Sequence, residues 1–191
     1  MKYTTTDVSE KILSTTFELL SEHGYVNVSM RDIAKKSGVA VSQITYYYQT
    51  KENLLVQVIK KANREYLSEV NRELEKIDSP NEKMRFFLEW VEKLITKRTD
   101  FYRLLLDFYN LATWNKEIQK EFKAHINETI FLLCEILKQM SPKNNLINSY
   151  SREEIAKLIV GACLGVAMQY VIDEDDSEAV SSLKIIQSFF A

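Results

Sequence analysis

Side chains able to bind both bases and phosphates occur close together near the N-terminus, in the stretch 41–51. Gln43 presents a donor and an acceptor that match the edge of adenine, and Val41 can contact a thymine methyl group. Tyr46, Tyr47 and Lys51 suit phosphate oxygens, which fix a protein on the duplex without reading its sequence. The alternative is that the tyrosines pack internally and the polar side chains are simply solvated. The stretch therefore predicts an interface with double-stranded DNA.

Two short helices joined by a glycine turn are expected to position these side chains. Ser29 and Asp32 have the spacing of a capping box, so a helix should begin at about Met30. Gly38 gives the backbone the freedom to leave that helix and turn sharply. This pattern predicts a helix-turn-helix, whose second helix enters the major groove.

The second helix should have one buried and one exposed face. Ile44 and Tyr48 are four residues apart and share a face, which we assign to the core. At about 100° per residue, the opposite face and its flanks are polar. The residues expected to face solvent are Ser42, Gln43, Thr45 and Tyr46.

The order of these motifs is informative beyond the individual residues. The chain contains Arg31-Asp32-Ile33-Ala34, Gly38-Val39, Tyr46-Tyr47-Tyr48 and Thr50-Lys51-Glu52. This series resembles the N-terminal motif of the tetracycline-repressor (TetR) family of bacterial transcriptional regulators. The resemblance implies a helix-turn-helix DNA-binding domain over residues 6–66, with its motif at 29–48, and a helical effector-binding and dimerisation domain over 67–191. The candidate DNA contacts are Ser29, Arg31, Val41, Ser42, Gln43, Thr45, Tyr46, Tyr47 and Lys51.

The sequence departs from the family pattern in the recognition helix itself. Ala40 stands where the family usually has a capping Ser, which weakens the start of this helix unless Ser42 compensates. Thr45 replaces a common Tyr, and Val41-Ser42 replaces a frequent basic-small pair. The resemblance therefore extends to the fold and the phosphate contacts, and not to the operator sequence.

Charge is distributed unevenly along the chain, whose formal net charge is −2. Between Gly24 and Arg64 there are seven basic residues and two acidic ones, whereas residues 67–191 hold 16 basic and 20 acidic residues. A local basic patch on an acidic body is typical of a protein that binds DNA at specific sites.

The composition predicts an all-α fold. Only 4 Gly and 2 Pro occur in 191 residues, which favours long helices with few tight turns. We expect about nine helices, a three-helix DNA-binding domain followed by a larger helical domain. The fourth, over 51–77, would join the two domains, and 141–149 would be a loop. The expected helices cover 9–23, 30–37, 41–48, 51–77, 80–97, 100–112, 116–140, 152–172 and 178–190.

Aromatic residues concentrate in the middle of the chain, between 86 and 131. Core packing explains many of them, but several carry a polar group that a dry core uses sparingly. A few polar groups in an apolar, aromatic wall are typical of a small-molecule site. His125 could equally be a core histidine, and Glu89 and Asp107 would favour a cationic effector. The candidate effector-binding residues are Trp90, Tyr102, Tyr109, Trp114, Phe122, His125 and Thr129.

The last two expected helices have the pattern of an association surface. Small residues at Gly161, Ala162 and Gly165 allow close approach of another helix, and the segment 178–190 is widely apolar. By resemblance, this pair would form the four-helix interface of a homodimer. A two-fold dimer places two recognition helices on two related half-sites.

Other classes of function find little support. Signatures of phosphate loops, nucleophile elbows and HExxH metal sites are missing from the sequence, so we expect no enzyme, metal or cofactor. Cys134 and Cys163 have no partner at metal-ligand spacing. We see no signal peptide or run of about eighteen apolar residues, so we expect a cytoplasmic protein without a membrane partner.

These observations predict a ligand-responsive transcriptional regulator. It would act as a repressor that a small-molecule effector, of unknown identity, releases from a palindromic operator. The alternative is a regulator of the same fold that recruits a protein partner and binds no specific DNA.

Overall fold

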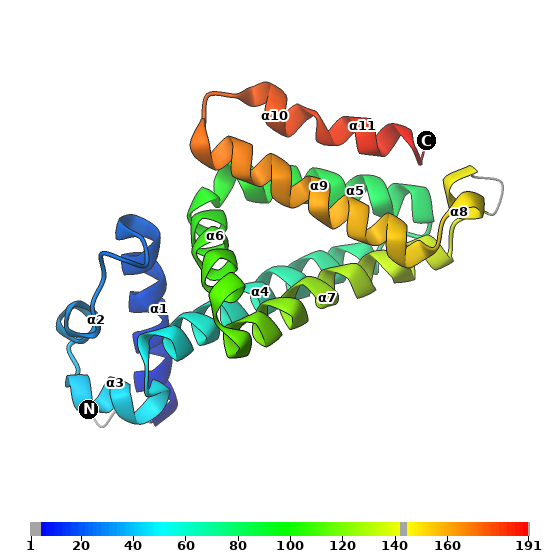
Figure 1. Ribbon diagram of the computed structural model, residues 1–191. Helices are drawn as coiled ribbons and strands as arrows, with labels where there is room; N and C mark the ends of the chain where they lie inside the picture. The colour runs from blue at the N-terminus through cyan, green and yellow to red at the C-terminus, as the bar shows by residue number, and fades with distance from the viewer. Residues whose placement is uncertain (1–4, 142–144, 191) are drawn as a thin grey trace. The chain divides into compact units, whose positions relative to one another are not determined.

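The computed structural model describes residues 5–141 and 145–190, which form eleven α-helices and no strand (Figure 1). The all-α prediction is confirmed. The helices are α1 (Thr5–His23), α2 (Met30–Ser37), α3 (Val41–Tyr48), α4 (Lys51–Leu74), α5 (Pro80–Lys97), α6 (Thr99–Trp114), α7 (Lys116–Lys138), α8 (Asn145–Ser149), α9 (Arg152–Ile172), α10 (Ser177–Ser181) and α11 (Leu183–Ser188).

The helix count exceeds the expected nine for two local reasons. The short helix α8 lies in the segment expected to be a loop, of which residues 142–144 fall outside the described residues. The helix expected over 178–190 is divided into α10 and α11 at Ser182. In addition, α4 ends at Leu74 and not at Ile77. Of these differences, the one in α4 lies at a helix end, where sequence patterns are least informative.

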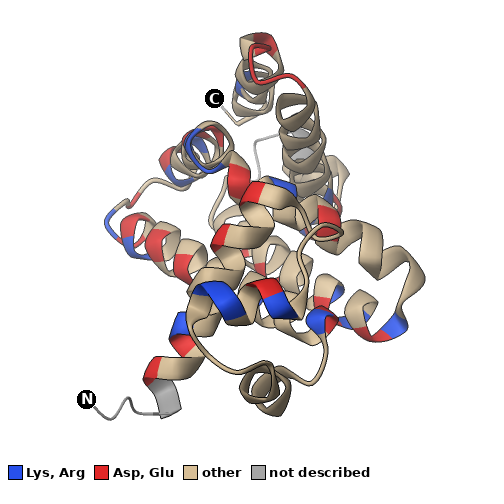
Figure 2. Ribbon diagram, turned by 90° about the vertical axis from the view of Figure 1, so that its left-hand side faces the viewer, with Lys and Arg blue, Asp and Glu red and all other residues tan. Residues whose placement is uncertain are grey.

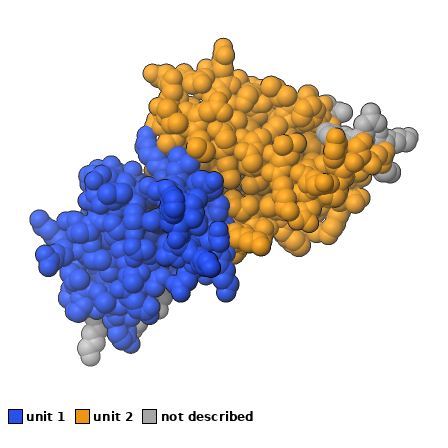
Figure 3. Space-filling view, viewed as in Figure 1, with its two compact units in different colours: residues 1–64, 103–122 blue, residues 65–102, 123–191 orange. Residues whose placement is uncertain are grey.

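The chain divides into two compact units (Figure 3). Unit 1 consists of residues 1–64 and 103–122, and unit 2 of residues 65–102 and 123–191. Helices α4, α6 and α7 therefore each have residues in both units. The functional boundary that we expect near residue 66 remains a prediction.

Unit 1 is built around α1, which packs against α2, while α2 packs against α3. Helix α1 ends at Gly24, whose φ of 76° lies in the left-handed region that favours glycine. Apolar side chains from successive helices are almost completely inaccessible to solvent and form one core. They include Ile12, Leu20, Ile33, Ile44, Leu54, Leu55 and Ile59.

Unit 2 is organised around α9, which contacts α5, α10 and α11. Ser151 caps this helix, and its backbone N–H and hydroxyl donate to the Glu154 carboxylate at 2.8 and 2.7 Å. By length and composition α9 is apolar enough to cross a membrane, contrary to our reading of the sequence. Its Ile155, Ile159 and Val166 are buried against the rest of the unit, as in the core helix of a globular protein.

Candidate DNA-binding surface and its supports

Helix α2 is fixed at both ends by the residues that the sequence indicated. The Ser29 hydroxyl accepts from the Asp32 N–H at 3.2 Å, and the Asp32 carboxylate accepts from the Ser29 N–H at 2.8 Å. The hydrogen bond from the Ser29 hydroxyl also lowers the pKa of Asp32, so this carboxylate remains charged. At the other end Gly38 adopts a φ of 67°. The predicted capping box and glycine turn are both present.

Helix α3 begins without a side-chain cap. Ala40 is its N-cap residue, and no side chain supplies a capping hydrogen bond. The Ala40 carbonyl accepts from the N–H groups of Gln43 and Ile44 at 3.0 and 3.3 Å. Ser42 does not replace the missing cap. The N–H groups at the start of α3 therefore have no side-chain acceptor.

The two faces of α3 differ as expected. Ile44 is fully buried and Tyr48 is almost so, with its hydroxyl 2.8 Å from the Ser9 hydroxyl of α1. On the other face Tyr46 is 80% exposed, and its ring lies edge-on to Tyr47 at 5.4 Å between centroids. The other exposed residues are Val41, Ser42, Gln43 and Thr45. Figure 2 shows that α3 carries no charged residue.

The start of α4 follows α3 after a two-residue connection. Thr50 caps α4, since its hydroxyl accepts from the Asn53 N–H at 3.1 Å. Gln49 has a φ of 62°, which is unusual for a residue other than glycine. These two residues turn the chain so that the ends of α3 and α4 lie close together.

Lys51 has a structural role that the sequence did not indicate. Its ammonium donates to the Tyr25 and Val28 carbonyl oxygens at 2.6 and 2.7 Å and lies 4.0 Å from the centre of the Tyr25 ring. Burial lowers the pKa of Lys51. Because the contacts join residues more than twenty positions apart, no local sequence pattern could reveal them.

Several members of the basic patch are paired with carboxylates of other helices. Lys36 lies 3.4 Å from Glu18, Lys60 lies 2.5 Å from Glu121, and Lys61 pairs with Glu10. Arg31 and Lys35 are exposed, and within the described residues neither forms an ion pair. The charge available to DNA is therefore smaller than a count of basic residues suggests.

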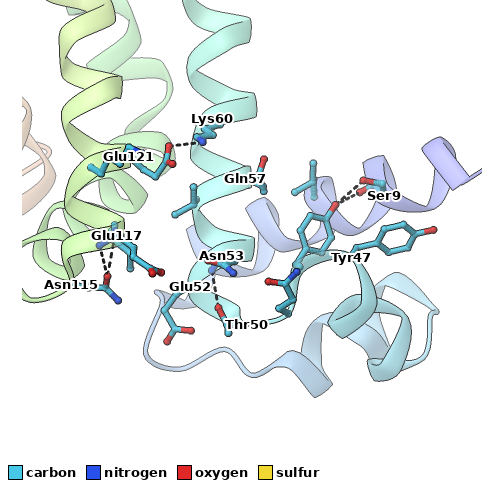
Figure 4. Close-up of a pocket in the computed structure, with 16 residues that line it drawn as sticks. Ser9, Tyr47, Thr50, Glu52, Asn53, Gln57, Lys60, Asn115, Glu117 and Glu121 are labelled. Carbon is cyan, nitrogen blue, oxygen red and sulfur yellow. Dashed lines mark hydrogen bonds and ion pairs between the residues drawn. The ribbon is translucent and has the colours of Figure 1, made fainter.

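A polar groove of about 820 Å³ lies in unit 1 beside the end of α3 (Figure 4). Side chains of α1, α4 and the start of α7 line it, among them Ser9, Gln57 and Glu117. Lys60 of α4 and Glu121 of α7 both line the groove and form an ion pair. None of our predicted effector residues lines this groove.

The candidate effector residues are distributed over both units. Trp90, Tyr102, His125 and Thr129 belong to unit 2, where Tyr102 is buried and the other three are partly so. The remaining candidates, Tyr109, Trp114 and Phe122, belong to unit 1.

Burial and exposure divide the candidates further. Burial lowers the pKa of His125 to about 4, so its imidazole is neutral at neutral pH. Trp114 is 88% exposed, and Tyr109 is half exposed with its ring 5.4 Å from that of Phe122. Within the described residues, no group of three or more His, Cys, Asp or Glu could hold a metal ion.

Asp107, which we considered as a contact for a cationic effector, binds the backbone of the connection after α1. Its carboxylate accepts from the Tyr25 backbone N–H at 2.8 Å, while the Tyr25 hydroxyl donates to Glu52 at 2.8 Å. Tyr25 and Asp107 are 82 positions apart, so no local sequence pattern predicts this hydrogen bond.

One face of α9 exposes apolar and small residues at helical spacing. Leu158 is 68% exposed and Ile172 is 82% exposed, with Met168 between them. Gly161 and Gly165 lie on the same stripe, and a Cβ built on either meets no atom within 4 Å. This stripe faces away from the core residues of the same helix.

Comparison with known proteins agrees with this geometry. Residues 12–58 match the family described as bacterial regulatory proteins, tetR family. The fatty acid metabolism regulator protein of Bacillus subtilis (strain 168) is 24% identical over 124 residues, which are 63% of this chain and 59% of that protein. The chain thus matches about three fifths of the length of that relative.

Solved structures share the fold over nearly the whole chain. A transcriptional regulator from Saccharomonospora viridis in complex with choline superposes with a TM-score of 0.82 at 19% identity, over 97% of this chain and 95% of that one. FadR from Bacillus subtilis in complex with stearoyl-CoA gives 0.81 at 16% identity, over 95% and 96%. The fold is that of a helix-turn-helix domain joined to a helical body. Residues 12–58 are thus similar to the tetR family of bacterial regulatory proteins, and the chain as a whole shares the fold of these solved structures.

Proposed function

We propose that the protein is a ligand-responsive repressor that binds a near-palindromic operator as a homodimer. The exposed face of α3 carries this proposal, because it presents hydrogen-bonding side chains on a helix whose opposite face is buried. An uncharged, polar helix surface suits the base edges of the major groove, while neighbouring residues contact phosphates.

Each candidate DNA contact has a distinct role in this proposal. Gln43 and Val41 contact base edges, and Ser42 and Thr45 contact bases or phosphates from the flanks. Tyr46, Tyr47 and Arg31 position the unit on the backbone, together with Ser29 at the start of α2. Lys51 contributes by its charge near the start of α4 and by holding the connection before α2.

The exposed stripe of α9 is the proposed dimer surface, together with Ile185 of α11 and Phe189, which directly follows that helix. Glycines in the stripe leave room for a second helix at close range, and the flanking apolar side chains would be covered by the same stripe of a second copy.

Effector binding in the C-terminal body would act on DNA through the helices that have residues in both units. A shift of α4 or α6 would change the spacing of the two recognition helices in the dimer, so that both no longer fit their half-sites. A coupling free energy of about 1–3 kcal/mol would change DNA affinity by roughly 5–150-fold.

The chemistry of unit 2 favours an effector with an apolar part, such as an acyl chain. No Asp or Glu is buried among the described residues of unit 2, so a bare cation would find no buried counter-charge there. Related folds are known in complex with stearoyl-CoA and with choline. Titrating the DNA complex with both compounds tests this preference, and release by choline alone would contradict it.

The DNA immediately upstream of the gene of this protein is the first operator to test. We expect wild-type protein to bind it tightly, with affinity that falls steeply as salt rises. The double variant Gln43→Ala, Tyr46→Ala should lose most of this affinity, because it removes an amide and a ring from the exposed face of α3. A fluorescence anisotropy titration at several salt concentrations measures both quantities.

A matched control makes the loss specific. Gln119 and Tyr150 are exposed residues outside the helix-turn-helix, so Gln119→Ala, Tyr150→Ala removes the same two side-chain types. The control should bind as the wild type does. If the wild type binds no DNA at low salt, the partner-recruiting alternative becomes the better explanation.

A further inference from the structure

Tyr25, in the connection between α1 and α2, is held by three charged residues. Asp107 accepts from its backbone N–H at 2.8 Å, and Lys51 donates to its carbonyl oxygen at 2.6 Å. Glu52 accepts from its hydroxyl at 2.8 Å. The ring is buried beneath the Lys51 ammonium. We call these four residues the Tyr25 clamp.

The clamp fixes the path of the chain into α2. Gly24 turns the backbone at the end of α1, and its N–H bonds to the Leu20 carbonyl at 2.8 Å. Lys51 also holds the carbonyl of Val28, immediately before the Ser29 cap. Hydrogen bonds therefore fix the connection near both of its ends, at Tyr25 and at Val28. We expect the direction of α2 and α3 relative to α1 to depend on these bonds.

The three charged residues of the clamp come from helices that have residues in both units. Lys51 and Glu52 are in the first turn of α4, and Asp107 is in the middle of α6. A displacement of α6 along its axis would withdraw the Asp107 carboxylate from the Tyr25 N–H. A buried N–H that loses a charged acceptor carries a substantial desolvation cost.

We infer that Asp107 is a positioning residue that couples α6 to the DNA-binding helices through the Tyr25 backbone. This inference deepens the proposed function and rests on it. Because coupling between two sites is reciprocal, DNA bound to α3 must stabilise the contact between Tyr25 and Asp107, and with it α6. The coupling is thus measurable with DNA as the ligand, without knowledge of the effector.

Hydrogen exchange measured by NMR tests this inference in the free protein and in the DNA complex. In the free protein, Asp107→Ala should make the Tyr25 amide exchange about tenfold faster or more, since a bond to a charged acceptor is lost. In the wild type, adding duplex DNA should slow exchange in both α3 and α6. In Asp107→Ala, DNA should slow exchange in α3 but no longer in α6.

Two further variants separate coupling from simple loss of structure. Asn110→Ala removes an exposed polar side chain from α6 and should leave every rate unchanged. Asp107→Asn keeps an acceptor oxygen and should restore both the Tyr25 protection and the response of α6, which a merely destabilised helix would not regain. If Asp107→Ala does not fold, Asp107→Ser takes its place in the same comparison, because the serine side chain is one carbon shorter and lacks the carboxylate that accepts from the Tyr25 N–H.

The outcomes distinguish this inference from the proposed function. Unchanged Tyr25 exchange in Asp107→Ala, or a response of α6 to DNA that survives the substitution, would overturn the coupling role. If the wild type binds no DNA, the proposed function fails. The Tyr25 amide in the free protein then still reports whether Asp107 holds the connection.

Discussion

At the scale of single residues, His125 shows how burial constrains an ionisable group. Its imidazole in α7 has a pKa lowered to about 4, because the charged form loses hydration inside the protein. In the unfolded chain the pKa of histidine is about 6.5. The folded state therefore binds fewer protons than the unfolded state between these two values, and its stability falls as pH is lowered through this range.

We predict a specific acid sensitivity from this difference. The free energy of unfolding should fall by roughly 3 kcal/mol on account of His125 between pH 6.5 and 4, with little further loss from this residue below pH 4. Urea denaturation of the wild type and of His125→Gln over this range measures the effect. The variant should lack this component, and parallel pH profiles would show that His125 is not buried in its neutral form.

At the scale of elements, α3 is fixed less firmly at its start than α2. It has eight residues and no side-chain cap at Ala40, whereas α2 has a full capping box. Introducing a hydroxyl by Ala40→Ser should raise the free energy of unfolding by about 0.5–1 kcal/mol, because a serine at this position accepts from the start of the helix.

The reverse substitution at the start of α2 serves as the control. Ser29→Ala removes the cap of α2 and should lower stability by about 1 kcal/mol. Thermal unfolding followed by circular dichroism compares the two. Equal melting temperatures for the wild type and Ala40→Ser would mean that the first turn of α3 is already fully satisfied.

The sequence predicted features within one helix better than contacts between helices. The caps at Ser29, Thr50 and Ser151 were predictable because each bond joins residues three apart. The burial of Ile44 and Tyr48 followed from helical periodicity. The contacts of Lys51 were not predictable, since they depend on the packing of α4 against the connection after α1. For the same reason, a count of basic residues overestimated the unpaired positive charge, because Lys36, Lys60 and Lys61 pair with carboxylates of other helices.

At the scale of the whole molecule, we expect the apolar stripe of α9 to determine whether the protein is a monomer or a dimer. Leu158 and Ile172 lie at its two ends and are largely exposed in the single chain. Exposed apolar side chains at regular helical spacing are typical of a covered surface.

Charge on the stripe should separate the two copies. Leu158→Glu, Ile172→Glu places two like charges from each subunit in the proposed interface, so the variant should sediment as a monomer at concentrations where the wild type is dimeric. Phe131→Glu, Val26→Glu is the matched control, because it charges exposed apolar residues of other elements. A wild type that sediments as a monomer at every concentration would refute this interface.

The division of α3 into two faces has a consequence for evolution and for engineering. Only Ile44 and Tyr48 attach this helix to the core, so its solvent-facing residues can be exchanged without a change in packing. Altering Val41, Ser42 or Gln43 should therefore retarget the protein to a new DNA sequence at little cost in stability. If the proposed function is correct, related chains can diverge in the promoters they control while the buried scaffold of the helix-turn-helix is inherited unaltered.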